Sequence, residues 1–201
     1  MPSSLIRGKH VICKIDDSGE PVVVDDGAMF QRDGSIVEVG RYADLAARYQ
    51  PDEVIGSAEH VVMPGLVNGH HHIGVTPVQL GSLDQPLELW FATRMAARDV
   101  DPYLDTLYSA FEMLESGVTT VHHIHGARRG PVSGWTASAK RILQAYRDVG
   151  MRVTYSFGFR DQNRLVYKDD HEFAASLPEP LDAEIGEMLE GAAIPFEQYM
   201  T

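Results

Sequence analysis

Six of the nine histidines in this 201-residue chain fall in two short clusters. The first is P-G-L-V-N-G-H-H-H at residues 64–72, and the second is V-H-H-I-H-G at residues 121–126. Side chains two positions apart on a β-strand project to the same side. His70 and His72 could therefore bind one metal ion through neutral ring nitrogens, while His71 projects to the other side.

Two imidazoles of this kind suit Zn²⁺, or Fe or Mn where carboxylates complete the ligand set. Short histidine motifs are common, and a structural role is the ordinary alternative for any one of them. A ligand role for His70 and His72 is favoured by their position. They follow the apolar segment V-V-M-P-G-L-V at residues 61–67, which is typical of a strand covered on both faces.

The elements that must position the clusters alternate between strand and helix. Residues 101–117 predict a helix that Asp101 caps, with Pro102 in the first helical position and Gly117 after its end. The side chains spaced for one face of this helix, which we expect to face the core, are Leu104, Leu107, Tyr108, Phe111 and Leu114.

A second helix is predicted over residues 137–149, with Gly150 as its stop, between strands at 118–124 and 151–159. Its apolar stripe holds Ile142, Leu143, Tyr146 and Val149. Strands separated by helices imply βαβ units and a parallel sheet. The segment that begins near residue 168 is expected to be helical in pieces, without a fourth strand.

Residues 1–60 are predicted to form a separate, small β-rich module. Short strand-like segments are divided by turn signals, of which R-D-G-S at 32–35 is a good hairpin signal. A short helix over 41–49 must stop before Pro51. We therefore expect two domains, 1–60 and 61–201.

Composition excludes several classes of protein. Hydrophobic residues make up 44% of the chain and charged residues 23%, which is an ordinary globular mixture. The net charge of −12 argues against a nucleic-acid or anionic-membrane surface. The start of the chain lacks the apolar core of a signal peptide, and its single cysteine excludes an internal disulfide framework, so we expect a cytoplasmic protein.

The nonapeptide at 64–72 closely resembles the P-G-[LF]-[IV]-N-x-H-x-H signature of the amidohydrolase superfamily of metal-dependent hydrolases. The segment 22–40 resembles that family's amino-terminal β-module. Q-P-L-E-L-W-F at 85–91 and G-V-T-T-V at 117–121 resemble its aminohydrolase and chlorohydrolase branch, which includes adenosine-type and guanine deaminases. The likeness covers most of residues 5–160.

This resemblance implies an α/β fold, a (β/α)8 TIM-type barrel of which the chain holds about the first three β/α units. It implies that His70 and His72 are the first two ligands of a divalent metal, most simply Zn²⁺. In the family, two further histidines and an aspartate come from later strands. Metal-activated water then attacks a carbon that bears nitrogen or another leaving group.

Three residues are predicted to contact a small-molecule substrate. Trp90 lies beside the pocket by the resemblance. His125 ends the second strand, at the barrel mouth where such enzymes keep their chemistry, and Gln162 follows the third strand. Structural roles are the alternative for all three. The cluster H-H-I-H departs from the family pattern, so metal ligation by His122 or His123 is a weaker hypothesis.

The predicted function is hydrolysis of carbon–nitrogen bonds, as a deaminase of a heterocyclic amine. The alternatives are a ring-opening amidase or chlorohydrolase of the same superfamily, and a non-catalytic fragment or structural subunit. A complete barrel needs roughly 250 residues. We therefore expect the carboxy-terminal half of the barrel to be supplied in cis or by another chain, a homo-oligomeric assembly, and an inactive protein without that half.

Overall fold

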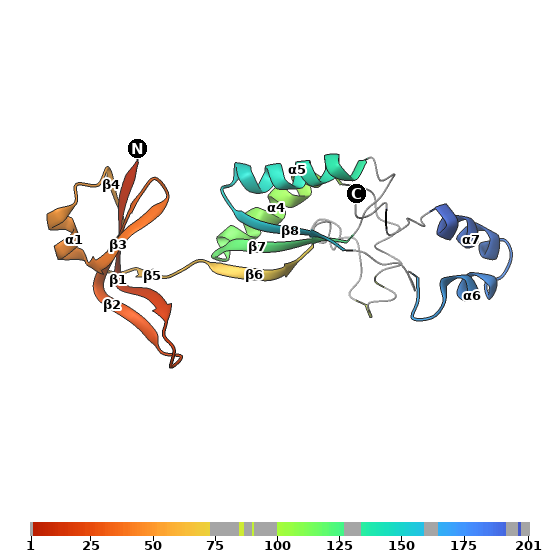
Figure 1. The fold of residues 1–201 in the computed structure, drawn as a ribbon, viewed down its shortest axis with the longest axis horizontal. Coiled ribbons are helices and arrows are strands. Elements are labelled where there is room, and N and C mark those ends of the chain that lie inside the picture. Colours follow the sequence, from red (N-terminus) through yellow and green to blue (C-terminus); the bar gives the residue numbers. More distant parts are fainter. Residues whose placement is uncertain are drawn as a thin grey trace. The chain divides into compact units, whose positions relative to one another are not determined.

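The computed structural model of this protein describes residues 2–72, 100–126, 134–158 and 165–191, together with 85–86 and positions 90 and 197. The chain divides into two compact units, Met1–Leu66 and Val67–Thr201 (Figure 1). Among the described residues, no helix is both long and apolar enough to cross a membrane.

A five-stranded sheet forms the first unit, with the strand order β3-β2-β1-β4 and β5 also paired with β1. Its elements are β1 (Ser3–Ile15), β2 (Pro21–Arg32), β3 (Ser35–Arg41), α1 (Tyr42–Arg48), β4 (Glu53–Gly56) and β5 (Val61–Val62). Between β2 and β3, Asp33 and Gly34 have φ of 55° and 76°, as a primed hairpin turn requires. The predicted hairpin is confirmed.

A small core joins α1 to the sheet of this first unit. Its buried members are Leu5, Ala28, Phe30 and Leu45. Tyr49, directly after α1, stacks on Phe30 with ring centroids 4.0 Å apart and donates a hydrogen bond to Glu38 at 2.8 Å. These contacts fix the end of α1 against the sheet, so the short helix expected at 41–49 is confirmed.

The apolar segment 61–67 is not the single covered strand that its composition predicts. It is divided between β5 and β6 (Leu66–His71), with Met63 to Gly65 outside both strands. Pro64 causes the break because it has no N–H to donate to a ladder. The large side chains Val61, Met63, Leu66 and Val67 are all at least half exposed. The prediction of a strand covered on both faces was therefore wrong.

The second unit contains the alternating strands and helices. Its elements are β6, α4 (Pro102–Glu115), β7 (Val118–His125), α5 (Trp135–Asp148), β8 (Arg152–Phe157), α6 (Asp170–Ala175) and α7 (Leu181–Gly191). The sheet order is β6-β7-β8, and β7 and β8 are parallel. Figure 1 shows α4 and α5 on the same face of this sheet. After β8, the described residues hold helices and no strand, as predicted.

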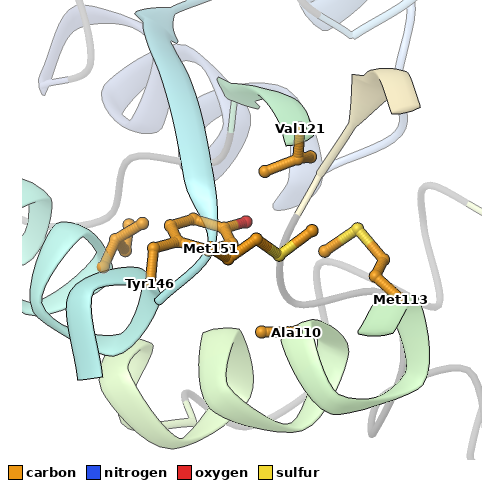
Figure 2. Packing of buried hydrophobic residues seen from close by; sticks show 6 residues of the cluster. Ala110, Met113, Val121, Tyr146 and Met151 are labelled. Atoms are coloured by element: carbon orange, nitrogen blue, oxygen red, sulfur yellow. The ribbon is translucent and has the colours of Figure 1, made fainter. Parts of the chain in front are cut away.

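The core of the second unit lies between the sheet and these two helices (Figure 2). Its buried side chains are Ala110 and Met113 of α4, Val121 of β7, Ile142 and Tyr146 of α5, and Met151 before β8. Ile142 and Tyr146 belong to the apolar stripe that the sequence predicts for the second helix, so the buried face of α5 is confirmed.

The buried face of α4 differs from the one that its apolar spacing predicts. Leu104, Tyr108 and Phe111 are 49–58% exposed. The buried side chains are instead Asp105, Thr106, Ser109, Ala110 and Met113. Small side chains let α4 approach the strands and α5 closely, whereas a row of Leu and Phe would hold the helix farther away. The prediction of the core-facing stripe was wrong for this helix.

The amino-terminal end of α4 is capped and tied to α5. The Asp101 carboxylate accepts hydrogen bonds from the backbone N–H of Tyr103 and of Leu104, at 2.9 and 3.1 Å. Arg141 of α5 donates to both oxygens of the same carboxylate at 2.8 Å. The Arg141 hydrogen bond is the main cause that lowers the pKa of Asp101. The predicted cap is confirmed, and it also joins the two helices.

Met113→Ala is expected to lower the free energy of unfolding by about 2–5 kcal/mol, because it leaves a cavity in a packed core. The matched control is Phe111→Ala on the same helix, which should cost less than about 1 kcal/mol because that ring is half exposed. Urea denaturation of the two variants measures the difference. A larger loss for Phe111→Ala than for Met113→Ala would show that the apolar stripe, and not the small-residue face, is buried.

Asp101→Ala is expected to lower the free energy of unfolding by about 1 kcal/mol, the usual effect of losing an N-cap. Asp101→Asn keeps a capping oxygen and loses only the charge, so it should cost less. A lowered carboxyl pKa stabilises the fold at pH values above the ordinary pKa of 3.8. This stability is lost as the pH falls through the lower pKa of the folded state. The gap between wild type and Asp101→Asn should therefore close in acid. A gap that is constant with pH in denaturant titrations would contradict the ion pair.

Candidate metal centre

The end of β6 brings His70 and His72 together. Their Nε2 atoms lie 3.0 Å apart, and the two rings meet edge to face with centroids 4.8 Å apart. Because Zn–N bonds are about 2.0–2.1 Å long, two nitrogens at this separation can both reach one ion. The sequence-predicted pair is therefore adjacent and fits a shared metal.

A backbone carbonyl fixes the ring of His72. Its Nδ1 lies 2.7 Å from the carbonyl oxygen of Ile124 on the neighbouring strand β7. A carbonyl oxygen can only accept, so in the neutral ring Nδ1 carries the proton and Nε2 keeps its lone pair. That lone pair faces His70, and this tautomer is the one in which Nε2 can bind a metal.

Asn68 braces the backbone before His70. Its Oδ1 accepts a hydrogen bond from the His70 backbone N–H at 3.1 Å, and its Nδ2 donates to Sδ of Met113 at 3.7 Å. The first contact holds the segment of β6 that presents His70, and the second joins it to α4. Asn68 thus links the strand end to the helix layer.

His71 projects to the opposite face, as the strand alternation predicts. Its ring meets the ring of His123 edge to face, with centroids 5.8 Å apart. His123 is fully buried and its Nδ1 lies 2.9 Å from the hydroxyl oxygen of Tyr146 on α5. His71 therefore packs on the side of β6 opposite His70 and His72.

Burial keeps these inner histidines neutral. Desolvation is the main cause that lowers the pKa of His123 to about 3, and the neighbouring His71 adds to it. Burial also lowers the pKa of His71 and raises the pKa of Tyr146. Within the described part of the chain, Nε2 of His71 and Nε2 of His123 are buried and have no hydrogen-bond partner. A charged ring would leave a buried N–H unpaired, which is costly.

The two other histidines of the second cluster, His122 and His125, project to opposite faces of β7. His125 is only 5% exposed, bonds through Nδ1 with the hydroxyl of Tyr155, and stacks on Phe157. It lies on the His123 side of β7, away from the His70 and His72 side chains. His122 has the opposite parity, and its Nε2 lies 3.1 Å from Oγ of Ser156 on β8.

No complete metal site lies in the described residues. They contain no group of three or more His, Cys, Asp or Glu side chains that could hold a metal ion. Trp90 is half-buried, and its backbone N–H donates to the carbonyl of Pro86 at 2.9 Å. Gln162 lies outside the described residues. Substrate contacts by Trp90, His125 and Gln162 stay predictions.

Sequence reasoning missed two hydrogen-bond partners of these histidines. The Ile124 carbonyl has no sequence signature, because every residue has a backbone carbonyl. Tyr146 could have been noticed as a tyrosine on the buried stripe of its helix, since a buried hydroxyl usually requires a polar partner.

His123→Phe is expected to weaken the pH dependence of stability. In the wild type, the unfolded chain takes up a proton near the ordinary pKa of 6.5, while the folded state does so only near 3. Between pH 6.5 and 5, this single group should therefore remove about 1.5 kcal/mol of stability, which the variant does not lose. Tyr146→Phe is the matched control, because it removes the hydrogen bond but keeps the buried imidazole. Urea denaturation at the two pH values decides, and an unchanged slope in His123→Phe would contradict a neutral buried ring.

Comparison with known proteins finds a family match and curated relatives. The amidohydrolase family matches residues 61–196. A 5-methylthioadenosine/S-adenosylhomocysteine deaminase of Desulforamulus reducens is 31% identical over 161 residues, which cover 77% of this chain and 34% of that protein. The deaminase of the same name from Pyrococcus furiosus is 30% identical over 138 residues, with 66% and 29% covered. The chain spans about a third of the length of these relatives.

Solved structures give the same result for the fold. Guanine deaminase of E. coli superposes with a TM-score of 0.63 at 16% identity, over 94% of this chain and 43% of that one. An adenosine deaminase from Xanthomonas campestris with bound zinc gives 0.58 at 27% identity, over 76% and 33%. A triazine hydrolase from Arthrobacter aurescens gives 0.64 at 19% identity, over 95% and 42%. With the family match extending over more than half of its length, the chain belongs to the amidohydrolase family.

Proposed function

We propose that this chain is the first part of a metal-dependent deaminase that acts on a heterocyclic amine. In this proposal residues 1–60 are the amino-terminal β-module, and residues 61–201 begin a (β/α)8 barrel. His70 and His72 are two ligands of a divalent metal, with Zn²⁺ favoured over Fe and Mn. The observation that carries the proposal is the approach of the two Nε2 atoms to 3.0 Å at the carboxyl end of β6.

The names of the relatives support an amino group as the leaving group. Curated proteins about 30% identical to the chain are named as deaminases of adenine-containing compounds. A solved relative at 27% identity is an adenosine deaminase with bound zinc. Removal of an amino group from an aromatic heterocycle is the reaction that these names share. The loops after later barrel strands would select which amine is the substrate.

A bound ion of this class acts as a Lewis acid and activates water for attack on an sp² carbon at neutral pH. The contribution of this chain is to present two imidazoles in the correct tautomer. The Ile124 carbonyl keeps the proton of His72 on Nδ1, so that Nε2 stays available. Asn68 holds the backbone N–H of His70. His71 and His123 stay neutral behind the strand, which keeps additional positive charge away from a cationic centre.

The remaining chemistry is assigned to parts of a complete barrel that this chain does not hold. Further ligands and the proton-transferring groups would come from later strands, in cis or from a second polypeptide. Trp90 and Gln162 are proposed to contact the substrate. His125 is proposed as a third contact, and its ring would have to leave Tyr155 and Phe157 on the helix side of β7 to reach the substrate. A homo-oligomer is the proposed assembly.

His70→Ala and His72→Ala should each reduce bound metal to background and abolish ammonia release. The protein with a complete barrel should hold about one metal ion per site. Metal content is measured by elemental analysis, and ammonia release is measured against a panel of aminopurines, aminopyrimidines and triazines. The matched control is His171→Ala, which removes an exposed histidine of α6 and should change neither quantity.

The outcomes separate the candidate functions. Metal with ammonia release supports the deaminase, whereas chloride release or ring opening of a cyclic amide without ammonia would assign the alternative hydrolases. An intact protein without metal would refute the enzyme and favour a structural subunit. Metal retained in both alanine variants would refute the ligand assignment alone.

A further inference from the structure

The carbonyl that accepts a hydrogen bond from His72 belongs to a residue whose two chain neighbours are both anchored by hydrogen bonds. Ile124, whose oxygen lies 2.7 Å from His72 Nδ1, stands between His123 and His125 on β7. Both of these neighbours project to the helix side and bond to a tyrosine hydroxyl, His123 to Tyr146 and His125 to Tyr155. The residues on both sides of the Ile124 carbonyl are therefore held by groups on the opposite face of the sheet.

The two tyrosines come from different elements of the same core. Tyr146 lies on α5, is 0% exposed, and packs among the buried residues of the second unit. Tyr155 lies on β8 directly opposite His123 in the parallel register, and its ring stacks on the ring of His123 with centroids 5.3 Å apart. Of the two, Tyr146 connects the strand to a helix, so its bond fixes β7 relative to the helix layer.

A hydrogen bond is suited to this task because it is directional. Apolar side chains could fill the same space, but dispersion contacts have no preferred direction. A bond between Tyr146 and His123 restricts both distance and angle. His123 remains neutral because burial keeps its pKa near 3, so the bond persists over the whole physiological pH range.

We propose that Tyr146 and His123 are positioning residues for the metal ligand His72. Through the end of β7 they hold the Ile124 carbonyl at the distance that keeps the proton of His72 on Nδ1. The inference rests on the proposed function, in which Nε2 of His72 binds the metal. Neither residue touches the metal or the substrate in this assignment.

The first test reads the tautomer of His72 in the intact, metal-free protein by ¹⁵N NMR with labelled histidine. The wild type should show a protonated Nδ1 and an unprotonated Nε2. Tyr146→Phe and His123→Leu, which each remove the bond, should give a mixture of the two tautomers. His123→Asn places an amide near the position of Nδ1 and should restore the wild-type signal. Tyr103→Phe is the matched control, because it removes an exposed tyrosine bond to Asp148 on α5.

The second test measures Zn²⁺ affinity of the same variants by competition with a chelating dye. Tyr146→Phe and His123→Leu should bind Zn²⁺ about 10–100-fold more weakly, the usual effect of losing an outer contact of a ligand. Thermal unfolding is recorded in parallel. A purely structural role would lower stability while leaving both the tautomer and the affinity as in the wild type, and that result would overturn the proposal.

The tests remain decisive if a variant does not fold or the proposed function fails. A wild-type His72 protonated on Nε2 would overturn the positioning inference without any variant. A wild type with the Nδ1–H tautomer that binds no Zn²⁺ would refute the proposed metal centre, and the tautomer of Tyr146→Phe would still decide the role of Tyr146. Tyr146→Phe keeps the ring in the core and is the variant expected to fold.

Discussion

The alternation of side chains along β6 and β7 is the constraint on which the candidate metal centre depends. It places His70 and His72 on one face of the sheet and sends His71 and His123 to the other. The two faces then require opposite properties. One must leave nitrogen lone pairs accessible, and the other must bury imidazoles without charge. A shift of one residue in either strand would exchange these faces and destroy both arrangements.

The helix layer makes the buried face possible. α4 turns small side chains such as Ser109 and Ala110 toward the interior, which permits close packing against β7 and α5. Tyr146 then extends from α5 with its ring in the apolar core (Figure 2). Its hydroxyl oxygen lies 2.9 Å from Nδ1 of His123. The polar contact is tolerated because the hydrogen bond pairs the Tyr146 hydroxyl with Nδ1 of His123. The cost of burying a histidine is thereby limited, and the strand end is held in place.

The local features of this fold were predictable because neighbouring residues decide them. Asp33 and Gly34 make the hairpin, and Asp101 caps α4, irrespective of distant contacts. The approach of His70 to His72 likewise follows from strand geometry. The errors have a different origin. Pro64 interrupted an apolar run whose composition alone favoured a strand, and the apolar stripe of α4 did not become its buried face. Hydrophobic spacing indicates a helix, but it does not choose which face meets the core when close packing favours small residues.

The sequence by itself determined the positions of the two histidine clusters, their division into alternate faces, and the resemblance that led to the amidohydrolase family. These properties depend on residue type and on spacing along one strand. Only the tertiary structure decided the tautomer of His72 and the burial of His123. Both depend on groups far away in the chain, a carbonyl 52 residues after His72 and a tyrosine 23 residues after His123. Such contacts are created when strands and helices pack, and no local pattern encodes them.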